Sequence, residues 1–250
     1  MDLREGRVND DRDDDARHPW ERARLAVVRA LIGDHADTRR IIDLGAGDGY
    51  QARALANDGY DVTAVDPAFT NDDIASLQHR RVAARTSPPA PADSADVLLL
   101  DVIEHVDDDS QLLVNARALA RGGVVIVTVP AWPALWSAHD EALGHRRRYT
   151  PSSLAHACAK AGLVVVEEGA LFACLTPARA LALLRARLDT RQGPSRRAPA
   201  VASWRAPSMI GALITRALVV DAFVGRALAR AGFGALWPGL SLYAVCRSTP

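Results

Sequence analysis

Three glycines at alternate positions follow a run of apolar residues and precede a helical pattern. The run is Ile41–Leu44, and Gly45, Gly47 and Gly49 come directly after it, before Tyr50. Glycine lets the chain turn sharply and lets a ligand lie against the backbone. A dinucleotide-binding loop has its third glycine one position later, where this chain has Tyr50. The spacing therefore favours a nucleoside ligand without a pyrophosphate.

An aspartate ends the next predicted strand. Asp66 stands after Val62–Val65 and before Pro67. A carboxylate at this edge of a parallel sheet can accept hydrogen bonds from both hydroxyls of a ribose. A turn aspartate before proline is the alternative, and the combination with the glycine loop favours the ribose.

Glu104 and His105 follow a third apolar run, Val97–Leu100. Open sheets bind ligands at the carboxyl ends of their strands, and an imidazole of ordinary pKa titrates near neutrality. His105 is therefore the candidate general base, and Glu104 is predicted to orient the imidazole or to contact the ligands. A helix-start glutamate and an idle exposed histidine are the alternative for this pair.

The twenty residues after a fourth apolar run, Val124–Val129, are rich in aromatic and ionisable side chains, which is typical of a substrate-binding loop or lid. Within Pro130–Thr150 the predicted catalytic groups are His139 and Tyr149, and the predicted substrate contacts are Trp136, Asp140, His145 and Arg148. Arg146–Arg148 suit a clamp on a carboxylate or phosphate, with a solvated charge run as the alternative. His139, Asp140 and His145 match no standard spacing of metal ligands, so no metal is predicted.

Alternating strand and helix patterns position these residues. Strand patterns occur at Arg40–Leu44, Asp61–Val65, Val97–Leu100, Val124–Val129 and Leu163–Glu167, and helical patterns at His18–Asp34, Tyr50–Asp58, Asp107–Ala120 and Pro151–Ala161. The alternation predicts an α/β fold with a doubly wound parallel sheet and right-handed crossovers.

The last third of the chain is predicted to be a helical insertion, 176–237, before a final strand at Leu240–Cys246. Its helices are Thr176–Asp189 and Ser208–Ala231, and residues 18–175 and 238–250 form the main domain. The second helix is strongly apolar, but four charged residues interrupt it, so it does not span a membrane. It is left open whether 208–231 packs on the domain, forms a homodimer or makes a peripheral membrane contact. Packing on protein is favoured.

Composition narrows the function classes. Thirty basic and thirty acidic side chains balance, which argues against nucleic acid as a partner. Cys158, Cys174 and Cys246 lack the spacing of a zinc site or a disulfide framework, so a cytoplasmic location is expected. Residues 1–17 are charged, lack the apolar core of a signal peptide and are predicted to be a disordered arm.

The stretches IDLGAGDGY, VDP and ADVLLLDVIEHV resemble the class I S-adenosylmethionine-dependent methyltransferases, especially the Glu-His-Val branch near the quinone-biosynthesis methyltransferases. HPWERARLAVVRALI resembles the aromatic-plus-arginine helix before the first strand of many members. TVPAWPALWSAHDEALGHRRRYTPSSL resembles a signature of one subgroup of uncharacterised bacterial members. The resemblance covers 18–173 and the last strand. It implies a Rossmann-like seven-stranded sheet with an antiparallel last strand and S-adenosylmethionine as cofactor, and it says little about substrate.

Carried over residue by residue, the implied cofactor contacts are Asp43, Gly45, Gly47, Gly49, Asp66, Pro67 or Ala68, Asp101 and Val102. Trp20 is predicted to close over the cofactor, with core packing as the alternative. Related sequences usually carry an acidic residue after the third strand, where it meets adenine. The stretch Ala83–Pro89 has none, so Thr86, Ser87 or backbone atoms are expected to hold the adenine.

The sequence thus predicts methyl transfer to a small-molecule acceptor, through an oxygen nucleophile, with His105 as base. The acceptor can be a natural product or a sugar- or lipid-linked intermediate. One alternative is a protein that binds the cofactor for non-methylating chemistry. Another is a degenerate adaptor that acts through its helical insertion, and the intact glycine loop with Asp66 speaks against it.

Overall fold

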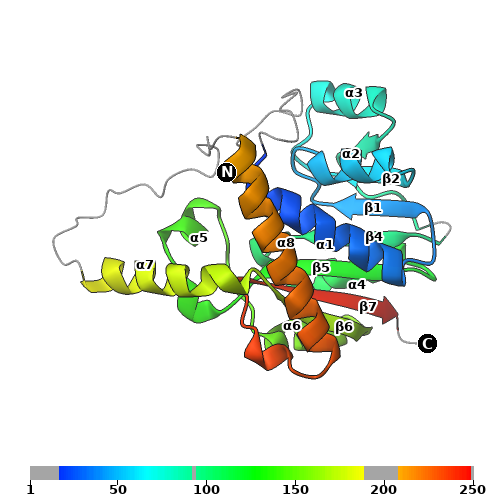
Figure 1. The fold of residues 1–250 in the computed structure, drawn as a ribbon. Helices are drawn as coiled ribbons and strands as arrows, with labels where there is room; N and C mark the ends of the chain where they lie inside the picture. The colour runs from blue at the N-terminus through cyan, green and yellow to red at the C-terminus, as the bar shows by residue number, and fades with distance from the viewer. Residues whose placement is uncertain (1–16, 92–93, 189–207, 249–250) are drawn as a thin grey trace.

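The computed structural model describes residues 17–91, 94–188 and 208–248, which form a seven-stranded sheet with helices on both faces (Figure 1). The strands are β1 (Arg40–Leu44), β2 (Asp61–Val65), β3 (Ala83–Arg85), β4 (Asp96–Leu100), β5 (Val124–Pro130), β6 (Leu163–Leu171) and β7 (Ser241–Ser248). Their order is β3-β2-β1-β4-β5-β7-β6. The pairs between β3 and β5 are parallel, and β7 is antiparallel to both its neighbours. The predicted Rossmann-like sheet with an antiparallel last strand is confirmed.

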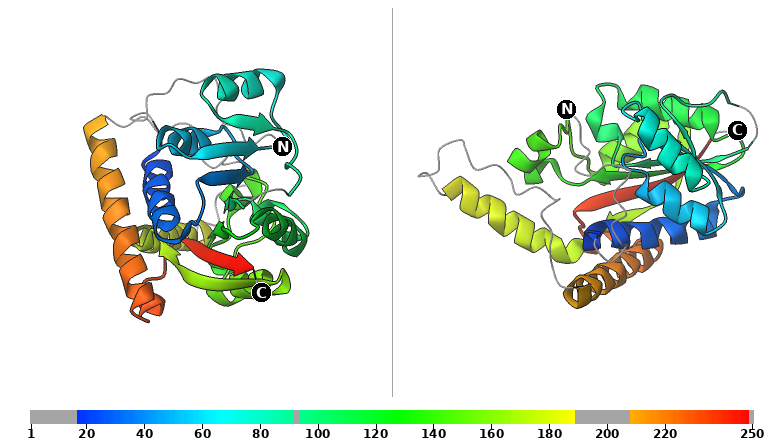
Figure 2. Two further views of the ribbon diagram at one scale, coloured as in Figure 1. Left: turned by 90° about the vertical axis from the view of Figure 1, so that its right-hand side faces the viewer. Right: turned by 90° about the horizontal axis from the view of Figure 1, so that it is seen from above.

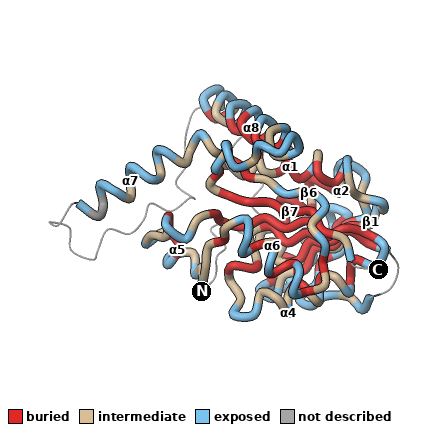
Figure 3. The backbone as a smooth tube through the Cα atoms, turned by 90° about the horizontal axis from the view of Figure 1, so that it is seen from below, coloured by how far each residue is buried: buried red, intermediate tan, exposed pale blue. Residues whose placement is uncertain are grey.

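Two apolar cores fill the spaces between the sheet and its helices. One face is covered by α1 (Pro19–His35), α2 (Tyr50–Asn57), α3 (Asn71–His79) and α8 (Ser208–Arg230). The other is covered by α4 (Asp109–Leu119) and α6 (Pro151–Lys160), as the two further views in Figure 2 help to follow. Because both faces are covered, the middle of the sheet is buried (Figure 3). Both β4 and β5 are buried along their whole length, which explains their nearly continuous apolar sequence.

Several elements differ from the sequence prediction. A 3-10 turn, η2 (Ile103–His105), follows β4, and α4 starts two residues later than predicted because Asp108 caps it by accepting from the Gln111 N–H at 2.9 Å. The loop after β5 contains η3 (Pro133–Leu135) and a short helix, α5 (Ala138–Ala142). The strand β6 extends four residues beyond its predicted end.

The two helices of the predicted insertion lie between β6 and β7 in the chain. The helix α7 (Thr176–Leu188) follows η4 (Ala173–Leu175) and projects away from the body (Figure 1). In contrast, α8 packs along α1 and β6, and η6 (Gly234–Leu236) leads from it towards β7. The two helices therefore have different surroundings.

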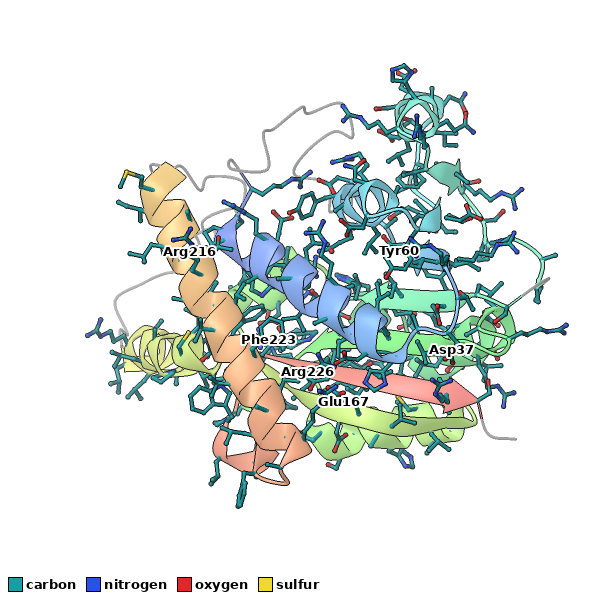
Figure 4. The ribbon with its side chains drawn as sticks, turned by 45° about the vertical axis from the view of Figure 1, so that its right-hand side comes forward. Asp37, Tyr60, Glu167, Arg216, Phe223 and Arg226 are labelled. Carbon is teal, nitrogen blue, oxygen red and sulfur yellow. The ribbon has the colours of Figure 1, made fainter. Side chains whose placement is uncertain are left out.

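A buried ion-pair cluster around Glu167 of β6 fastens α8 to the sheet (Figure 4). The carboxylate accepts from Arg226 Nε at 2.6 Å, from Arg230 at 2.7 Å and from Tyr243 Oη at 3.0 Å, and it lies 2.7 Å from His35 Nε2. Burial alone would raise the pKa of Glu167, but these partners outweigh it and hold the pKa well below its usual range. The cluster therefore links α1, β6, β7 and α8 through one charged side chain.

Part of the sequence prediction lies outside the described residues: positions 1–16 of the predicted arm, and residues 189–207, which include the segment between the two helices of the predicted insertion. Arg17, which we assigned to that arm, is described and pairs with Asp48. Within the described ranges, no helix combines the length and apolarity that crossing a bilayer requires.

Candidate active site

The glycine loop leaves β1 in a series of left-handed backbone conformations. Gly45, Gly47 and Gly49 have φ of 76°, 59° and 74°, a region that residues with a side chain rarely adopt. The N–H groups of Gly45 and Ala46 donate to the Val65 carbonyl at the end of β2. The loop is therefore tied to the carboxyl edge of the sheet.

The three glycines are needed for different reasons. A Cβ at Gly45 would lie 2.6 Å from Val102 Cγ2, and one at Gly49 would lie 2.6 Å from Leu77 Cδ2. A Cβ at Gly47 would have no atom within 4 Å. Packing against protein thus accounts for two of them, whereas Gly47 faces open space where a ligand can reach the backbone.

Asp66 connects the glycine loop to the end of β2. Its Oδ2 accepts from the Gly47 N–H at 2.9 Å and its Oδ1 accepts from the Ala68 N–H at 2.8 Å. Asp66 therefore stabilises the turn before Pro67, as in the alternative to ribose binding. An ionised carboxylate has about four acceptor positions, so the two that remain can serve ribose hydroxyls as well. Pro67 is exposed beside it.

Buried polar groups without partners lie around the loop. They include Asp43 Oδ2 and both amide atoms of Gln51, and the side chains of both residues are buried. Burial raises the pKa of Asp43 to about 7, although Arg24 opposes the shift. Buried polar groups are nearly always hydrogen-bonded, so these atoms indicate a ligand site.

Asp101, at the end of β4, pairs with Arg24 of α1. Asp101 has a left-handed backbone with φ of 58°, and its Oδ1 accepts from Thr128 Oγ1 at 3.2 Å. The Arg24 guanidinium lies 4.3 Å from the centre of the Trp20 ring, and Trp20 also packs on Phe172 with ring centres 6.1 Å apart. Trp20 therefore has the core-packing role that we considered, together with a cation–π contact to a charged group of the site.

Glu104 and His105 lie together on η2. Glu104 is fully buried and neither carboxylate oxygen has a partner, and burial, with the charge of Asp101, raises its pKa well above the usual range. Burial and His145 lower the pKa of His105. Both shifts favour the uncharged form, a protonated acid for Glu104 and a neutral imidazole for His105.

His105 also touches the loop after β5. Its ring meets that of His145 edge to face with centres 4.8 Å apart, and His145 Nδ1 lies 3.0 Å from Asp140 Oδ1. Ligand atoms of Glu104, His105 and His145 all lie within 4.8 Å of one another, a different trio from the one considered in the sequence. The geometry thus joins the predicted base to two residues predicted as substrate contacts.

In the loop after β5, the side chains of Asp140 and Arg148, which are predicted as substrate contacts, bind each other. Asp140 is fully buried and accepts from Arg148 Nε at 2.6 Å and from the Ser137 N–H at 2.9 Å. Burial would raise the pKa of Asp140, but His145 and Arg148 outweigh it and keep the pKa far below its usual range. Arg148 donates as well to the Ala131 carbonyl at 2.8 Å. These groups hold the loop in shape and have little capacity left for an acceptor.

The other two arginines of the predicted clamp bind the segment after η2. Arg146 donates to the His105 carbonyl at 2.8 Å and pairs with Asp107. Arg147 donates to the Asp107 carbonyl at 2.7 Å and pairs with Asp109 at 3.1 Å. Their contacts fit neither a clamp on a substrate anion nor a run of solvated charges, since both arginines fasten the loop after β5 to the residues next to His105.

Tyr149 is not placed to accept a proton. Its side chain is buried and its Oη donates to Asp109 Oδ2 at 2.7 Å, and burial raises its pKa well above the usual range. His139 is half-buried, and burial and Arg179 lower its pKa. Trp136 is half-buried, with its Nε1 at 3.4 Å from Glu141 Oε1. These two remain candidates without a contact to His105 in the described residues.

Two site residues were missed by the sequence reasoning. Arg24 pairs with Asp101, and Arg17 lies over the Tyr50 ring at 4.5 Å while pairing with Asp48 of the glycine loop. Both arginines belong to the first helical segment or its start, where the aromatic-plus-arginine pattern was the available signal. The partners are distant in sequence, so the pattern did not assign them a role.

The residues present fit S-adenosylmethionine. The cofactor carries a sulfonium, an ammonium, a carboxylate and ribose hydroxyls. The site offers the carboxyl groups of Asp43, Asp66 and Asp101, the guanidinium of Arg24 and the open backbone at Gly47. Acidic and basic groups of this kind match a zwitterion with an additional positive charge.

Comparisons with known proteins agree with a site for this cofactor. The profile of the methyltransferase domain family matches residues 15–168. The chain therefore belongs to this family, and the predicted class, the class I S-adenosylmethionine-dependent methyltransferases, is confirmed together with its cofactor.

Two similar curated relatives are named ubiquinone biosynthesis O-methyltransferase. That of Paramagnetospirillum magneticum is 32% identical over 139 residues, which cover 46% of this chain and 56% of the relative. That of Methylocella silvestris is 31% identical over 191 residues, 61% of this chain and 75% of the relative. The chain thus spans little more than half of the first relative's length.

Solved structures with this fold are more distant in sequence. A putative sarcosine dimethylglycine methyltransferase from Galdieria sulphuraria has a TM-score of 0.53 at 14% identity, covering 92% of this chain and 86% of that one. The 1,6-didemethyltoxoflavin-N1-methyltransferase of Burkholderia thailandensis, solved with S-adenosylhomocysteine, has a TM-score of 0.50 at 17% identity, covering 92% and 81%. At these identities the likeness shows the fold.

Proposed function

We propose that this protein transfers a methyl group from S-adenosylmethionine to an oxygen atom of a small-molecule acceptor, with His105 as the general base. The observation that carries the proposal is the placement of His105 at the carboxyl end of β4, beside the buried Glu104 and against the His145 ring. Burial also lowers the pKa of His105, which favours the uncharged ring. The names of the two ubiquinone biosynthesis relatives support an oxygen acceptor.

The bound cofactor supplies a methyl group on a sulfonium, which is already activated for displacement. The protein then mainly aligns the acceptor oxygen with that methyl group, and alignment can lower a barrier by up to about 7–11 kcal/mol. In this proposal Gly47 and Asp66 fix the nucleoside, and Asp43 and Asp101 stabilise the positive charges. Arg24 binds the carboxylate end.

His105 takes the proton that the acceptor hydroxyl releases. A lowered pKa keeps its ring uncharged at pH 7, so it can accept without first losing a proton. His145, held by Asp140, is a positioning residue that limits the rotation of the His105 ring.

The first test separates cofactor binding from catalysis. S-adenosylmethionine is titrated into the protein by calorimetry, and the protein is then incubated with the cofactor and a panel of phenols and other hydroxylated small molecules. Product mass spectrometry should show a gain of one CH2 group. His105→Ala should lower turnover by about 10²–10⁴-fold with little change in cofactor affinity. Unimpaired turnover would remove His105 from the base role.

The wild-type enzyme should also show a pH dependence. Turnover should rise with pH through a single ionisation below the usual range of histidine, because only the uncharged ring accepts a proton. In His105→Ala this acidic limb should be absent.

Asp66→Ala tests the ribose assignment. Hydrogen bonds to a charged acceptor contribute about 1.5–3 kcal/mol each, so losing two of them should weaken cofactor binding by at least about a hundredfold. The side chain of Ala68 cannot hydrogen-bond to the ribose, so Ala68→Ser, two residues from Asp66, serves as the control. An unchanged dissociation constant for Asp66→Ala would contradict the assignment.

The proposed reaction uses no metal ion. We expect turnover to survive dialysis against EDTA. If EDTA abolishes turnover and a divalent ion restores it, Glu104, His105 and His145 are ligands instead, since their ligand atoms lie close enough together. Saturable binding of S-adenosylmethionine without any methylated product would favour a protein that uses the cofactor for non-methylating chemistry. If the cofactor does not bind at all, the remaining hypothesis is an adaptor that acts through its helical insertion.

A further inference from the structure

The outward face of α8 is apolar, which is the reverse of an ordinary surface helix. Its inward face packs on α1 and β6 through buried residues that include Leu218, Ala222 and Arg226. The exposed large side chains recur every three or four positions along the outer face: Met209, Ile210, Leu213, Val220, Phe223 and Val224. Met209 is 84% exposed and Leu213 is 68% exposed. We call this row the outer stripe of α8.

Further large apolar side chains are exposed on α7 and after the end of α8. Leu181, Leu184 and Leu188 are exposed on the projecting helix α7, and Phe233 and Leu236 are exposed just after α8. A monomeric protein rarely leaves so many large apolar side chains in contact with water unless something else covers them.

Charge indicates what covers the stripe. Residues 176–237 hold ten of the thirty basic side chains and two of the thirty acidic ones in a chain that is neutral overall. Arg179, Arg226 and Arg230 are paired with acidic residues of the main domain, so the charge left for a partner is smaller than the formal +8. Asp221, one of the two acids, is buried and accepts from the N–H groups of Ala173 and Cys174. Arg216 lies within the outer stripe (Figure 4), and Arg185 is exposed on α7. Neither arginine has an acidic partner in the part of the chain that the structure describes.

A second copy of the chain fits this surface poorly. In a two-fold symmetric pair, the outer stripe would meet its own copy, with the two helices either parallel or antiparallel. Arg216 is at the middle of the stripe, so it would face its own copy without any acidic side chain on that face to neutralise the two charges. Like charges directly opposed in an interface disfavour that pairing.

We propose that the outer stripe of α8, together with α7, binds the surface of a bilayer that contains anionic lipids. Apolar side chains would enter the boundary between headgroups and acyl chains, and arginines would contact the phosphates. The cluster around Glu167 fixes the other face of α8 on the sheet, so the stripe is presented as a rigid surface. The helix lies on the membrane and does not cross it.

The test is sedimentation of the full chain with vesicles. Vesicles of phosphatidylcholine alone are compared with vesicles that also contain phosphatidylglycerol, at low and at raised salt. The protein should bind the anionic vesicles, and raised salt should weaken the binding. Val220→Ser combined with Phe223→Ser should lower binding by at least about tenfold, because both side chains lose their apolar contact with lipid. Arg216→Glu should lower it by about tenfold.

Matched controls distinguish the stripe from a general effect. Arg121→Glu makes the same charge change at an exposed arginine outside the insertion, and Val164→Ser removes an exposed valine from β6. Both should bind vesicles as wild type does, and the melting temperature and cofactor affinity of every variant should be unchanged.

Three results would overturn the proposal. They are equal binding to both vesicle types at low salt, an equal loss of binding in the control variants, and a dimer in sedimentation velocity that the Val220 and Phe223 changes dissociate. The assay needs no methyl acceptor, so its outcome is independent of the proposed reaction.

Discussion

The glycine loop and the loop after β5 differ in whether their buried polar groups are hydrogen-bonded within the protein. Around the glycine loop, buried side-chain atoms of Asp43 and Gln51 lack partners. In the loop after β5, Asp140 and Arg148 are equally buried, yet they satisfy each other. Both regions looked similar in sequence, since each concentrates ionisable residues after a strand.

The difference indicates which charges are available for a ligand. An unpaired buried carboxyl group costs free energy that a bound ligand can recover, whereas a paired one must first break its own contacts. We therefore expect substitutions near the glycine loop to alter binding more than stability, and substitutions in the loop after β5 to do the reverse.

Asp140→Ala should have the largest effect on stability. It leaves the guanidinium of Arg148 buried without its partner, which typically costs about 3–5 kcal/mol. Urea unfolding measures the loss. Asp107→Ala breaks the exposed pair with Arg146 and should cost at most about 1 kcal/mol. Equal losses in the two variants would show that the Asp140 network is not what holds the loop.

Two glycine substitutions sharpen the comparison within one loop. Gly45→Ala should destabilise the protein by about 2–4 kcal/mol, because the new Cβ meets Val102 in a backbone region that alanine avoids. Gly47→Ala should cost only about 1–2 kcal/mol, which is the backbone contribution alone.

The effect of these substitutions on cofactor affinity is not expected to follow their effect on stability. Gly47→Ala is expected to weaken binding by at least tenfold in calorimetry, because the methyl group occupies the open space above the loop. If Gly47→Ala binds S-adenosylmethionine like wild type, the cofactor does not approach the backbone at this position.

Asp43→Asn should stabilise the ligand-free protein at neutral and higher pH. The carboxyl group stays protonated in the folded state up to a pKa of about 7, whereas an unfolded aspartate ionises above about pH 4. The folded state thus binds the proton more tightly, and stability is lost as pH rises from about 4 to 7. Asparagine removes this loss, so the gain should be on the order of 1–3 kcal/mol at pH 8.

The same variant contains its own control. At about pH 3 the gain should nearly vanish, because the folded and unfolded carboxyl groups are then both largely protonated. Cofactor affinity should fall, since the amide carries no negative charge. Thermal unfolding at the two pH values, with and without cofactor, measures all three effects, and a gain that is independent of pH would contradict the assignment of the raised pKa.

Tyr149→Phe should have a small effect. It removes the hydrogen bond to Asp109 and should lower stability by about 1–2 kcal/mol, with the pH profile of turnover unchanged. A profile that loses its acidic or basic limb would instead restore Tyr149 to the catalytic residues.

The fold could be predicted because burial leaves a periodic record in the sequence. The continuous apolar runs of β4 and β5 and the glycines after β1 each report a local requirement, for burial or for a backbone conformation. Charge pairing leaves no such record. Arg24 and Asp101 are 77 residues apart, and nothing in their neighbourhoods shows that they meet. For the same reason, the spacing of Asp140 and Arg148 did not reveal that they bind each other.

The Glu167 cluster has a consequence for how the molecule opens. Its four partners come from α1, β7 and α8, so α8 cannot detach without exposing a buried carboxylate and its arginines together. Amide protons of α8 should then exchange with deuterium as slowly as those of the central strands. The helix α7 is held at its start, where Arg179 donates to Ser137 Oγ at 2.5 Å and pairs with Asp140 at 3.5 Å. Amide protons of its exposed later turns should exchange within the first time points, so this part of α7 and α8 belong to different cooperative units.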